Sequence, residues 1–356
     1  MADIACPLCL NQGTILFAQT TDRLLETTNK TFSLRECRAC SIIFLAPTPT
    51  EVELQSYYPA GYWWSEPNRT QYFFRTVGKR LESLYRKWAL HGHIRFVNQA
   101  IHHVVKEGEA VNLLDVGCSG GTFLHELARQ GIAVRGLDLS QEAVAHARRV
   151  YGLNCAVGDL THSPWRDERF SLVTSFHVLE HVPDPRSFLR AARKALTERG
   201  RLVLQVPNIR SWQFHVFGAG WYGLDPPRHL VNFSDRALVR LLLETGYEVL
   251  RQKRFSLRDD APAWVSSLFP SLDPLSRMAK HAREGKIRIP SSALGIFQNF
   301  VYFLLVLAAI PIALCDSLWG RGATLLIEAR KYSNPSVDSA GITQETERNL
   351  SSQNGE

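Results

Sequence analysis

Apolar runs that suit buried strands alternate along the chain with segments that have helical spacing. The first run, at 111–116, leads through a glycine-rich turn into a helical stretch at 122–130. Further strands are predicted at 132–139, 155–160, 170–178, 200–206, 247–255 and 323–330, and further helices at 140–151, 183–196 and 234–246. Strands and helices that alternate at this spacing predict an α/β fold, a doubly wound, Rossmann-like sheet of seven strands.

Polar residues stand at the carboxyl ends of four of these predicted strands. They are Asp115, Asp138, Asp159 and His177. In a doubly wound sheet, ligands bind in the crevice beyond the carboxyl ends of the parallel strands. The pattern therefore predicts a ligand site at this edge of the sheet.

The turn after the first strand carries Gly117, Gly120 and Gly121. Glycine permits a sharp turn close to a ligand, and the free N–H groups of the next helix point into the same crevice. A dinucleotide-binding turn follows G-x-G-x-x-G, but Ser119 occupies the place of its second glycine. Asp115 precedes the turn, where a carboxylate would repel a pyrophosphate and attract a cation such as a sulfonium. A tight turn without a ligand is the alternative interpretation.

Four of the seven cysteines form two Cys-x-x-Cys pairs near the N-terminus, and these are Cys6, Cys9, Cys37 and Cys40. Two such pairs hold a tetrahedral zinc ion in a zinc ribbon, and a long loop between them adds little closure cost. We predict a structural zinc site in a ribbon-like module at 1–45. Redox-active pairs and unligated thiols are the alternatives. Four cysteine ligands leave no open position on the metal, so a catalytic role is not expected.

Composition narrows the classes of function. The chain is 45% hydrophobic and 21% charged, which is typical of a globular protein. The formal net charge is +7 without a dense run of lysine and arginine, so no nucleic-acid partner is expected. The first residues show no secretory signal. Together with the cysteine pairs, this predicts a cytoplasmic protein in a reducing compartment.

The segment at 46–106 joins the cysteine module to the first strand. Its first part is rich in Pro, Tyr and Trp, and apolar residues recur at helical spacing between 71 and 106. We predict an aromatic linker followed by helices, which together cap the ligand site. The alternative is that the aromatic residues only fill the core.

Five motifs follow one another along the chain, at residues 115–121, 137–140, 157–160, 176–185 and 200–208. As an ordered set, they resemble the motifs of the class I S-adenosylmethionine-dependent methyltransferases. The first resembles that family's first motif, with Ser119 departing from its more common glycine. The fourth resembles the segment that follows the fourth strand in methyltransferases of small molecules. Some branches of the family also carry two N-terminal Cys-x-x-Cys pairs followed by a Pro- and Tyr-rich stretch. The resemblance implies a methyltransferase domain at 107–332.

The resemblance also implies S-adenosylmethionine as the cofactor. It assigns Asp138 to the ribose hydroxyls, which a carboxylate accepts in strong charge-assisted hydrogen bonds. Leu139 would lie along the base, and Asp159 would accept from the exocyclic amine of adenine. A helix-capping acid at Asp138 and a turn residue at Asp159 are the alternatives. The implied cofactor-binding residues are Asp115, Gly117, Cys118, Gly120, Gly121, Asp138, Leu139, Asp159, Leu160, Phe176 and His177.

The loop at 218–230 is the expected acceptor region, because family members often place substrate contacts there. We expect Trp221 and Tyr222 to wall the acceptor site, with Arg228 and His229 as further substrate-binding residues. His177 or His229 is expected to assist deprotonation as the catalytic residue. A His229 that is hydrogen-bonded within the loop and inert is the alternative.

His177, Glu180 and His181 also spell the H-x-x-E-H pattern of a class of zinc peptidases. That chemistry needs both histidines on one face of a helix. Here His177 ends a strand and Pro183 follows closely, so a peptidase is not expected. A divalent ion held by Glu180 and a histidine, in support of an oxygen acceptor, is a separate alternative.

The last third of the chain contains an apolar segment at 297–315 inside an insertion at 260–320. Its length suits a membrane span, but the following strand at 323–330 belongs in the sheet, and one crossing would separate the two. Three interpretations stay open: a buried helix, a hydrophobic lip over the acceptor pocket, or a patch lying on a membrane. We favour a buried or interfacial helix over a spanning one. The polar tail at 333–356 is expected to be disordered.

These patterns together predict an S-adenosylmethionine-dependent methyltransferase. The acceptor would be a small or lipid-linked molecule, attacked in line with the methyl carbon. The protein would be cytoplasmic, with possible peripheral contact at the inner membrane face through 297–315. An NAD-type oxidoreductase and a non-catalytic zinc-ribbon scaffold are the alternatives, and no oligomeric state is predicted.

Overall fold

The computed structural model describes residues 4–58, 74–283 and 293–332. Its largest element is a seven-stranded sheet in the order β10-β11-β8-β7-β4-β5-β6. The strands are β4 (Asn112–Val116), β5 (Ala133–Asp138), β6 (Cys155–Val157), β7 (Phe170–Phe176), β8 (Leu196–Pro207), β10 (Tyr247–Lys253) and β11 (Thr324–Lys331). β6, β5, β4, β7 and β8 pair in parallel, whereas β11 runs antiparallel to both neighbours. The predicted Rossmann-like fold is confirmed.

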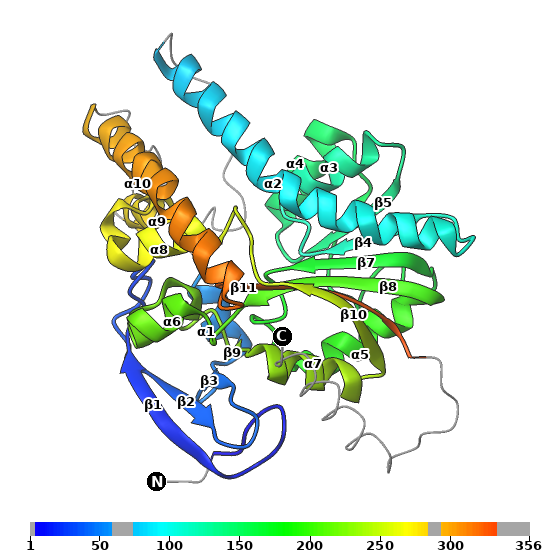
Figure 1. Cartoon of the computed structure of the whole chain (residues 1–356), viewed down its shortest axis with the longest axis horizontal. Coiled ribbons are helices and arrows are strands. Elements are labelled where there is room, and N and C mark those ends of the chain that lie inside the picture. The colour runs from blue at the N-terminus through cyan, green and yellow to red at the C-terminus, as the bar shows by residue number, and fades with distance from the viewer. Residues whose placement is uncertain (1–3, 59–73, 284–292, 333–356) are drawn as a thin grey trace.

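Helices cover both faces of this sheet. Figure 1 shows α2, α3 and α4 over one face and α5 and α7 over the other. Their bounds are α2 (Phe74–Lys106), α3 (Thr122–Ala128), α4 (Gln141–Tyr151), α5 (Pro185–Ala195) and α7 (Asp235–Glu244). Ser140 caps α4 as predicted, because its side chain accepts the N–H of Ala143. Ser234 caps α7 in the same way by accepting from Ala237.

A second, four-stranded sheet joins the N-terminal module to a later loop. β1 (Thr14–Thr20), β2 (Phe32–Cys37) and β3 (Ile43–Leu45) pair antiparallel, and β3 then pairs with β9 (Val231–Asn232). The short helix α1 (Glu51–Ser56) follows, with a capping box at Thr50 and Glu53. Buried residues of these strands belong to the same hydrophobic cluster as those of β8. The N-terminal module is therefore fixed against the loop that follows β8.

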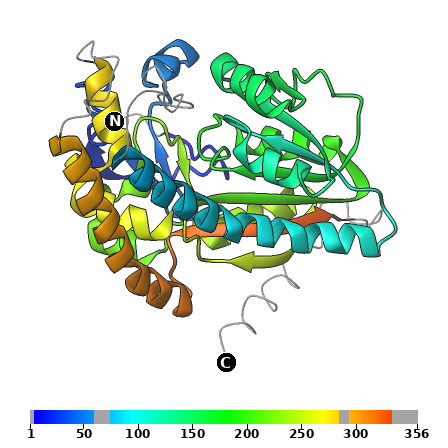
Figure 2. The ribbon, with the colours of Figure 1, turned by 90° about the horizontal axis from the view of Figure 1, so that it is seen from above.

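The segment after β8 forms α6 (Trp212–Phe217) and two short 3-10 helices, η1 (Gly218–Gly220) and η2 (Tyr222–Leu224). The insertion after β10 forms α8 (Asp260–Leu268), η3 (Pro270–Leu272), α9 (Pro274–Arg283) and α10 (Ala293–Leu318). Figure 2 shows α10 at one end of the molecule.

Among the described residues, one face of α10 is covered, and α8 covers it. Val306, Ala309 and Ala313 pack against Ala261 and Val265 of α8. Leu294–Leu318 has the length and hydropathy of a membrane helix, yet only 22% of its most apolar window is buried. The expectation of a buried helix thus holds for one face alone.

The predicted boundaries at 1–45, 46–106, 107–332 and 333–356 stay predictions. Residues 59–73 of the aromatic linker and the tail at 333–356 lie outside the described residues.

Candidate active site

The predicted site residues reach one edge of the sheet. β6, β5, β4 and β7 are adjacent and parallel, so their carboxyl ends lie side by side. Asp138 ends β5, Asp115 lies one residue before the end of β4, and His177 directly follows β7. Asp159 follows β6 by two positions. The four polar residues that were predicted at strand ends therefore lie at a common edge of the sheet.

The turn between β4 and α3 leaves no room for side chains at Gly117 and Gly121. Gly117 has a φ of +81°, and a Cβ there would lie 2.3 Å from Cγ2 of Val178. Gly121 has a φ of +82°, and its Cβ would lie 2.7 Å from Cδ1 of Leu153. Both backbone conformation and space therefore require glycine. The turn is pressed against the start of the segment that follows β7.

Asp138 supports the turn and keeps capacity for a ligand. Its Oδ2 accepts the N–H of Ser119 and its Oδ1 that of Ser140, each at 2.8 Å. The two carboxylate oxygens together have four lone pairs, so the group keeps acceptor capacity after these bonds. Burial raises the pKa of Asp138, while the backbone donors oppose that rise. Asp138 thus takes part in the turn before the helix, as the capping alternative proposed, without being saturated.

Asp115 is buried beneath the turn. Thr174 donates its hydroxyl to Asp115 Oδ1 at 2.6 Å. Burial raises the pKa of Asp115 to about 7, although the hydrogen bond from Thr174 opposes the shift. The group is thus balanced near neutral pH between its neutral and ionised forms, and a nearby cation would favour ionisation.

The remaining predicted cofactor residues differ in exposure. Leu139 is 71% exposed beyond β5, whereas Leu160 and Cys118 are buried. Asp159 Oδ1 accepts the backbone N–H groups of Thr161 and His162, which is the geometry of a turn residue. The other predicted residues are Phe176, whose ring meets His93 and Phe123 edge-on, and Gly120 in the turn.

His177 is held between two carboxylates. Its Nδ1 lies 3.1 Å from Glu180 Oε1, and its Nε2 lies 3.5 Å from Asp259 Oδ2 and 2.8 Å from Gln205 Nε2. Burial disfavours the charged ring, but the charge of Asp259 and the hydrogen bonds to both acids outweigh it and raise the pKa of His177. The amide N–H of Gln205 is a donor, so it faces a lone pair of His177 Nε2, and the ring hydrogen lies on Nδ1 toward Glu180. His93 extends the network, 2.6 Å from Gln205 Oε1.

His229 and His181 lie beside Glu180 in the neutral state. Their rings meet edge-on with centroids 4.6 Å apart. His229 Nδ1 lies 2.9 Å from the carbonyl of Gly223, and His181 Nδ1 lies 3.0 Å from that of Arg228. Burial lowers the pKa of each histidine to about 4. The hydrogen bond of His229 within its loop, which belonged to the alternative interpretation of this residue, is present.

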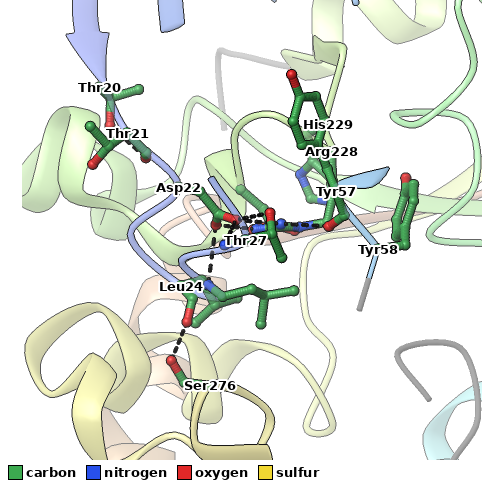
Figure 3. Close-up of polar contacts among 12 residues, drawn as sticks. Thr20, Thr21, Asp22, Leu24, Thr27, Tyr57, Tyr58, Arg228, His229 and Ser276 are labelled. Carbon is green, nitrogen blue, oxygen red and sulfur yellow. Dashed lines mark hydrogen bonds and ion pairs between the residues drawn. The ribbon is translucent and has the colours of Figure 1, made fainter. Parts of the chain in front are cut away.

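Arg228 is clamped inside the protein (Figure 3). Its guanidinium donates two hydrogen bonds to Asp22 and two to Asp225, at 2.6–2.9 Å, and a fifth at 3.1 Å to the carbonyl of Tyr57. The side chain is fully buried. Asp22 belongs to the N-terminal module, so this cluster ties that module to the loop before β9. Every guanidinium N–H is used, and none is left for an acceptor.

Trp221 and Tyr222 line a pocket that also includes Thr20, Arg23 and Pro270. Trp221 is buried and donates its indole N–H to Gln213. These two residues thus wall a pocket between the N-terminal module and η3.

The four N-terminal cysteines converge. All four thiol sulfurs lie within 4.8 Å of one another. The Sγ atoms of Cys6 and Cys40 are 3.6 Å apart, and those of Cys9 and Cys37 are 3.5 Å apart. Thiolates bound to zinc at 2.3 Å in a tetrahedron are about 3.8 Å apart, so the cluster fits a zinc ion.

Comparison with known proteins identifies the family of this chain. A model described as "Methyltransferase domain" matches residues 67–252, more than half of the chain. The chain belongs to the methyltransferase-domain family. The predicted class, an S-adenosylmethionine-dependent methyltransferase, is thereby confirmed at the level of the family.

Relatives of this methyltransferase domain include two proteins named ubiquinone biosynthesis O-methyltransferase. The one from Idiomarina loihiensis is 30% identical over 142 residues, which cover 36% of this chain and 58% of the relative. The one from Pasteurella multocida is 28% identical over 164 residues, which cover 38% of this chain and 68% of the relative. A solved putative sarcosine dimethylglycine methyltransferase from Galdieria sulphuraria aligns at 14% identity with a TM-score of 0.43, over 67% of this chain and 86% of its own.

Sequence reasoning missed several residues around the methyltransferase site. Gln205, Asp259 and His93 contact or approach His177, but they come from β8, the start of α8 and the middle of α2. No local pattern connects them. Adjacent acids at Asp259 and Asp260, where β10 gives way to a helix, were the one available signal.

Proposed function

We propose that this methyltransferase domain transfers a methyl group from S-adenosylmethionine to an oxygen of a small or lipid-linked acceptor. The observation that carries the proposal is the pair of carboxylates, Asp115 and Asp138, that borders the glycine turn. Acids at this position favour a cationic donor over a pyrophosphate. The family match supports methyl transfer over the oxidoreductase and scaffold alternatives. The O-methyltransferase names of the relatives support an oxygen acceptor.

The cofactor, when bound, supplies a methyl group on an already activated sulfonium. The chain's task is then to bind and align. The unused lone pairs of Asp138 would accept the two ribose hydroxyls. The exposed Leu139 would cover one face of the base. Asp159 would accept the adenine amine through Oδ2, because Oδ1 accepts several donors of its turn whereas Oδ2 has one contact, 3.3 Å from His162 Nδ1.

The two predicted catalytic histidines, His177 and His229, would have different roles. Both ring nitrogens of His177 are engaged, Nδ1 by Glu180 and Nε2 by Gln205, so it would hold this network in place rather than act as a base. His229 is neutral because burial lowers its pKa to about 4. It is in the protonation state for a base, though a weak one.

Arg228 would support the acceptor region without touching the acceptor. Its five hydrogen bonds to Asp22, Asp225 and Tyr57 fix the loop that carries His229. Its role is therefore that of a positioning residue in place of the substrate contact that the sequence suggested. Trp221 and Tyr222 stay candidates for the acceptor wall.

The N-terminal module would hold a structural zinc ion through Cys6, Cys9, Cys37 and Cys40. The spacing of the sulfurs supports this proposal. Zinc removal with a chelator is expected to lower the melting temperature of reduced protein. An unchanged melting temperature after verified metal loss would argue against a structural zinc.

The exposed stripe of α10 would lie on a membrane surface, which brings the enzyme to lipid-linked acceptors. Phe297, Phe300, Leu304, Leu307 and Leu314 are 40–61% exposed and recur at helical spacing. No charged residue occurs between 293 and 315. Such a face binds the interface between headgroups and acyl chains. The protein would then be cytoplasmic and peripheral at the inner face.

Flotation with anionic liposomes tests that membrane contact. The wild type should float with the vesicles, and the double variant F300E/L304E should stay at the bottom of the gradient. Val52→Glu, at a residue that is 79% exposed on α1, is the matched control and should float. Wild type that stays wholly in the soluble fraction would remove the membrane proposal.

Methyl transfer itself is tested with radiolabelled S-adenosylmethionine and lipid and small-molecule extracts of the source cells. The expected result is label in an extracted product that depends on active protein and on Asp138. Transfer that is equal in wild type and Asp138→Asn would contradict the assigned cofactor site.

A further inference from the structure

Three side chains with metal-binding atoms meet just beyond β7, apart from the turn that would hold the cofactor. Glu180, His181 and His229 each offer one ligand atom, and these atoms lie within 4.8 Å of one another. Glu180 and His181 follow β7, whereas His229 comes from the loop before β9. The three residues are therefore brought together by the fold and not by one local motif.

Glu180 has a buried oxygen without a partner. Its side chain has no solvent exposure, and its Oε1 faces His177 Nδ1. Its Oε2 has no hydrogen-bond partner among the described residues. A buried carboxylate oxygen is costly to leave unmatched, so an unpaired one needs an explanation. The charge and hydrogen bond of His177 outweigh burial and keep the pKa of Glu180 below its usual value.

The Nδ1 atom of each histidine faces a backbone carbonyl. His181 Nδ1 lies 3.0 Å from the Arg228 carbonyl, and His229 Nδ1 lies 2.9 Å from the Gly223 carbonyl. A carbonyl oxygen only accepts, so each Nδ1 carries the hydrogen and the lone pair of each neutral ring is on Nε2. Metal-binding histidines nearly always donate their other ring N–H to a carbonyl or carboxylate, which fixes the tautomer.

The supports of these histidines are rigid. The carbonyl that orients His181 belongs to Arg228, whose side chain is clamped by Asp22 and Asp225. His229 is the next residue in the same loop and is 8% exposed. A site on fixed supports loses little conformational entropy when it binds an ion.

We infer that Glu180, His181 and His229 form a second metal site, which takes a divalent transition-metal ion such as zinc. Two imidazoles and one carboxylate are a common ligand set for zinc with an open fourth position. That position would take water or an oxygen of the acceptor. Neighbouring ligands around zinc are about 3.4 Å apart, so binding would draw the three side chains together. With the ion bound, the Nε2 lone pair of His229 holds the metal, and the residue then acts as a ligand instead of a base. The inference concerns metal binding and does not depend on methyl transfer.

Metal counting tests the site in the full chain. Reduced protein is saturated with Zn²⁺, desalted and analysed by elemental mass spectrometry. One bound equivalent should disappear in Glu180→Gln and in His229→Gln. The same equivalent should remain in His215→Gln, which removes an exposed histidine on α6. It should also remain in C37S/C40S, which removes two ligands of the N-terminal cluster.

Cobalt gives a second measurement that is independent of folding yield. Co²⁺ bound by imidazole and carboxylate should show visible d–d absorption in C37S/C40S without thiolate charge-transfer bands, and His229→Gln in that background should lose it. The inference is overturned if the metal content of Glu180→Gln and His229→Gln equals that of the wild type. It is equally overturned if C37S/C40S binds no metal. Binding of S-adenosylmethionine, measured separately, distinguishes failure of this site from failure of the proposed function.

Discussion

Two groups of buried carboxylates in this protein have opposite characters. Asp115 and Asp138, at the ends of β4 and β5, accept a few neutral donors and retain lone pairs. Asp22 and Asp225 are bound to the guanidinium of Arg228 in a closed cluster. All four carboxylates are buried. The number and charge of their partners therefore separate a ligand site from a structural support more than burial does.

The largest expected effect is the loss of the closed cluster. Arg228→Met leaves Asp22 and Asp225 buried without their cation, and breaking a buried ion pair typically costs about 3–5 kcal/mol. Urea denaturation should show a loss of that size. Arg240→Met is the control, because Arg240 pairs with Glu244 on the exposed surface and should change stability by less than about 1 kcal/mol. Equal losses in both variants would refute a structural role for the cluster.

The next largest effect is expected at the glycine turn beside Asp115 and Asp138. Gly117→Ala places a Cβ 2.3 Å from Val178, so the turn must shift and S-adenosylmethionine affinity should fall by about 100-fold or more. Gly108→Ala is matched, because Gly108 has the same φ of +81° and no atom within 4 Å of the added Cβ. Titration calorimetry on both variants separates the clash from the cost of the backbone conformation. Wild-type affinity in Gly117→Ala would show that the turn does not shape the site.

A smaller effect is expected when the charge of Asp138 is removed. Asp138→Asn removes charge-assisted acceptance of the ribose hydroxyls, and such bonds contribute about 1.5–3 kcal/mol, or about 10–100-fold in affinity. Asp184→Asn serves as the control, since Asp184 also accepts a backbone N–H, at the start of α5, and is not one of the predicted cofactor-binding residues. The cofactor assignment would fail if both variants bound S-adenosylmethionine equally well.

The smallest effect is a pH dependence. The pKa of Asp115 is raised to about 7, so the group is neutral below and ionised above that pH. The affinity for the sulfonium should rise about tenfold between pH 6 and 8 and then level off. His93 and His229, each with a pKa of about 4, do not titrate in this window. Asp115→Asn should flatten the profile, and an affinity that falls with rising pH would contradict the assignment.

The sheet, and the edge of it that carries the predicted site, could be predicted because each strand has a local sequence pattern. Apolar runs that end in Asp115, Asp138 and His177 specify both a parallel strand and a polar end. The residues that hold the site's side chains and loops in place could not be predicted. Asp22 and Arg228 are 206 positions apart, and Asp259 reaches His177 from the start of α8. Such contacts depend on tertiary packing, which no local periodicity encodes.

The same limit applies to the acceptor loop. Arg228 and His229 were identified as chemically active residues, but only the fold shows that Arg228 is saturated and that His229 lies beside Glu180 and His181. The residue types were informative, whereas their partners decide their roles.

A calorimetric titration of the wild type with S-adenosylmethionine and, separately, with NAD tests the central claim most directly. The account predicts saturable binding of one S-adenosylmethionine per chain, weakened in Asp138→Asn, and no binding of NAD. Binding of NAD alone, or of neither compound, would contradict it.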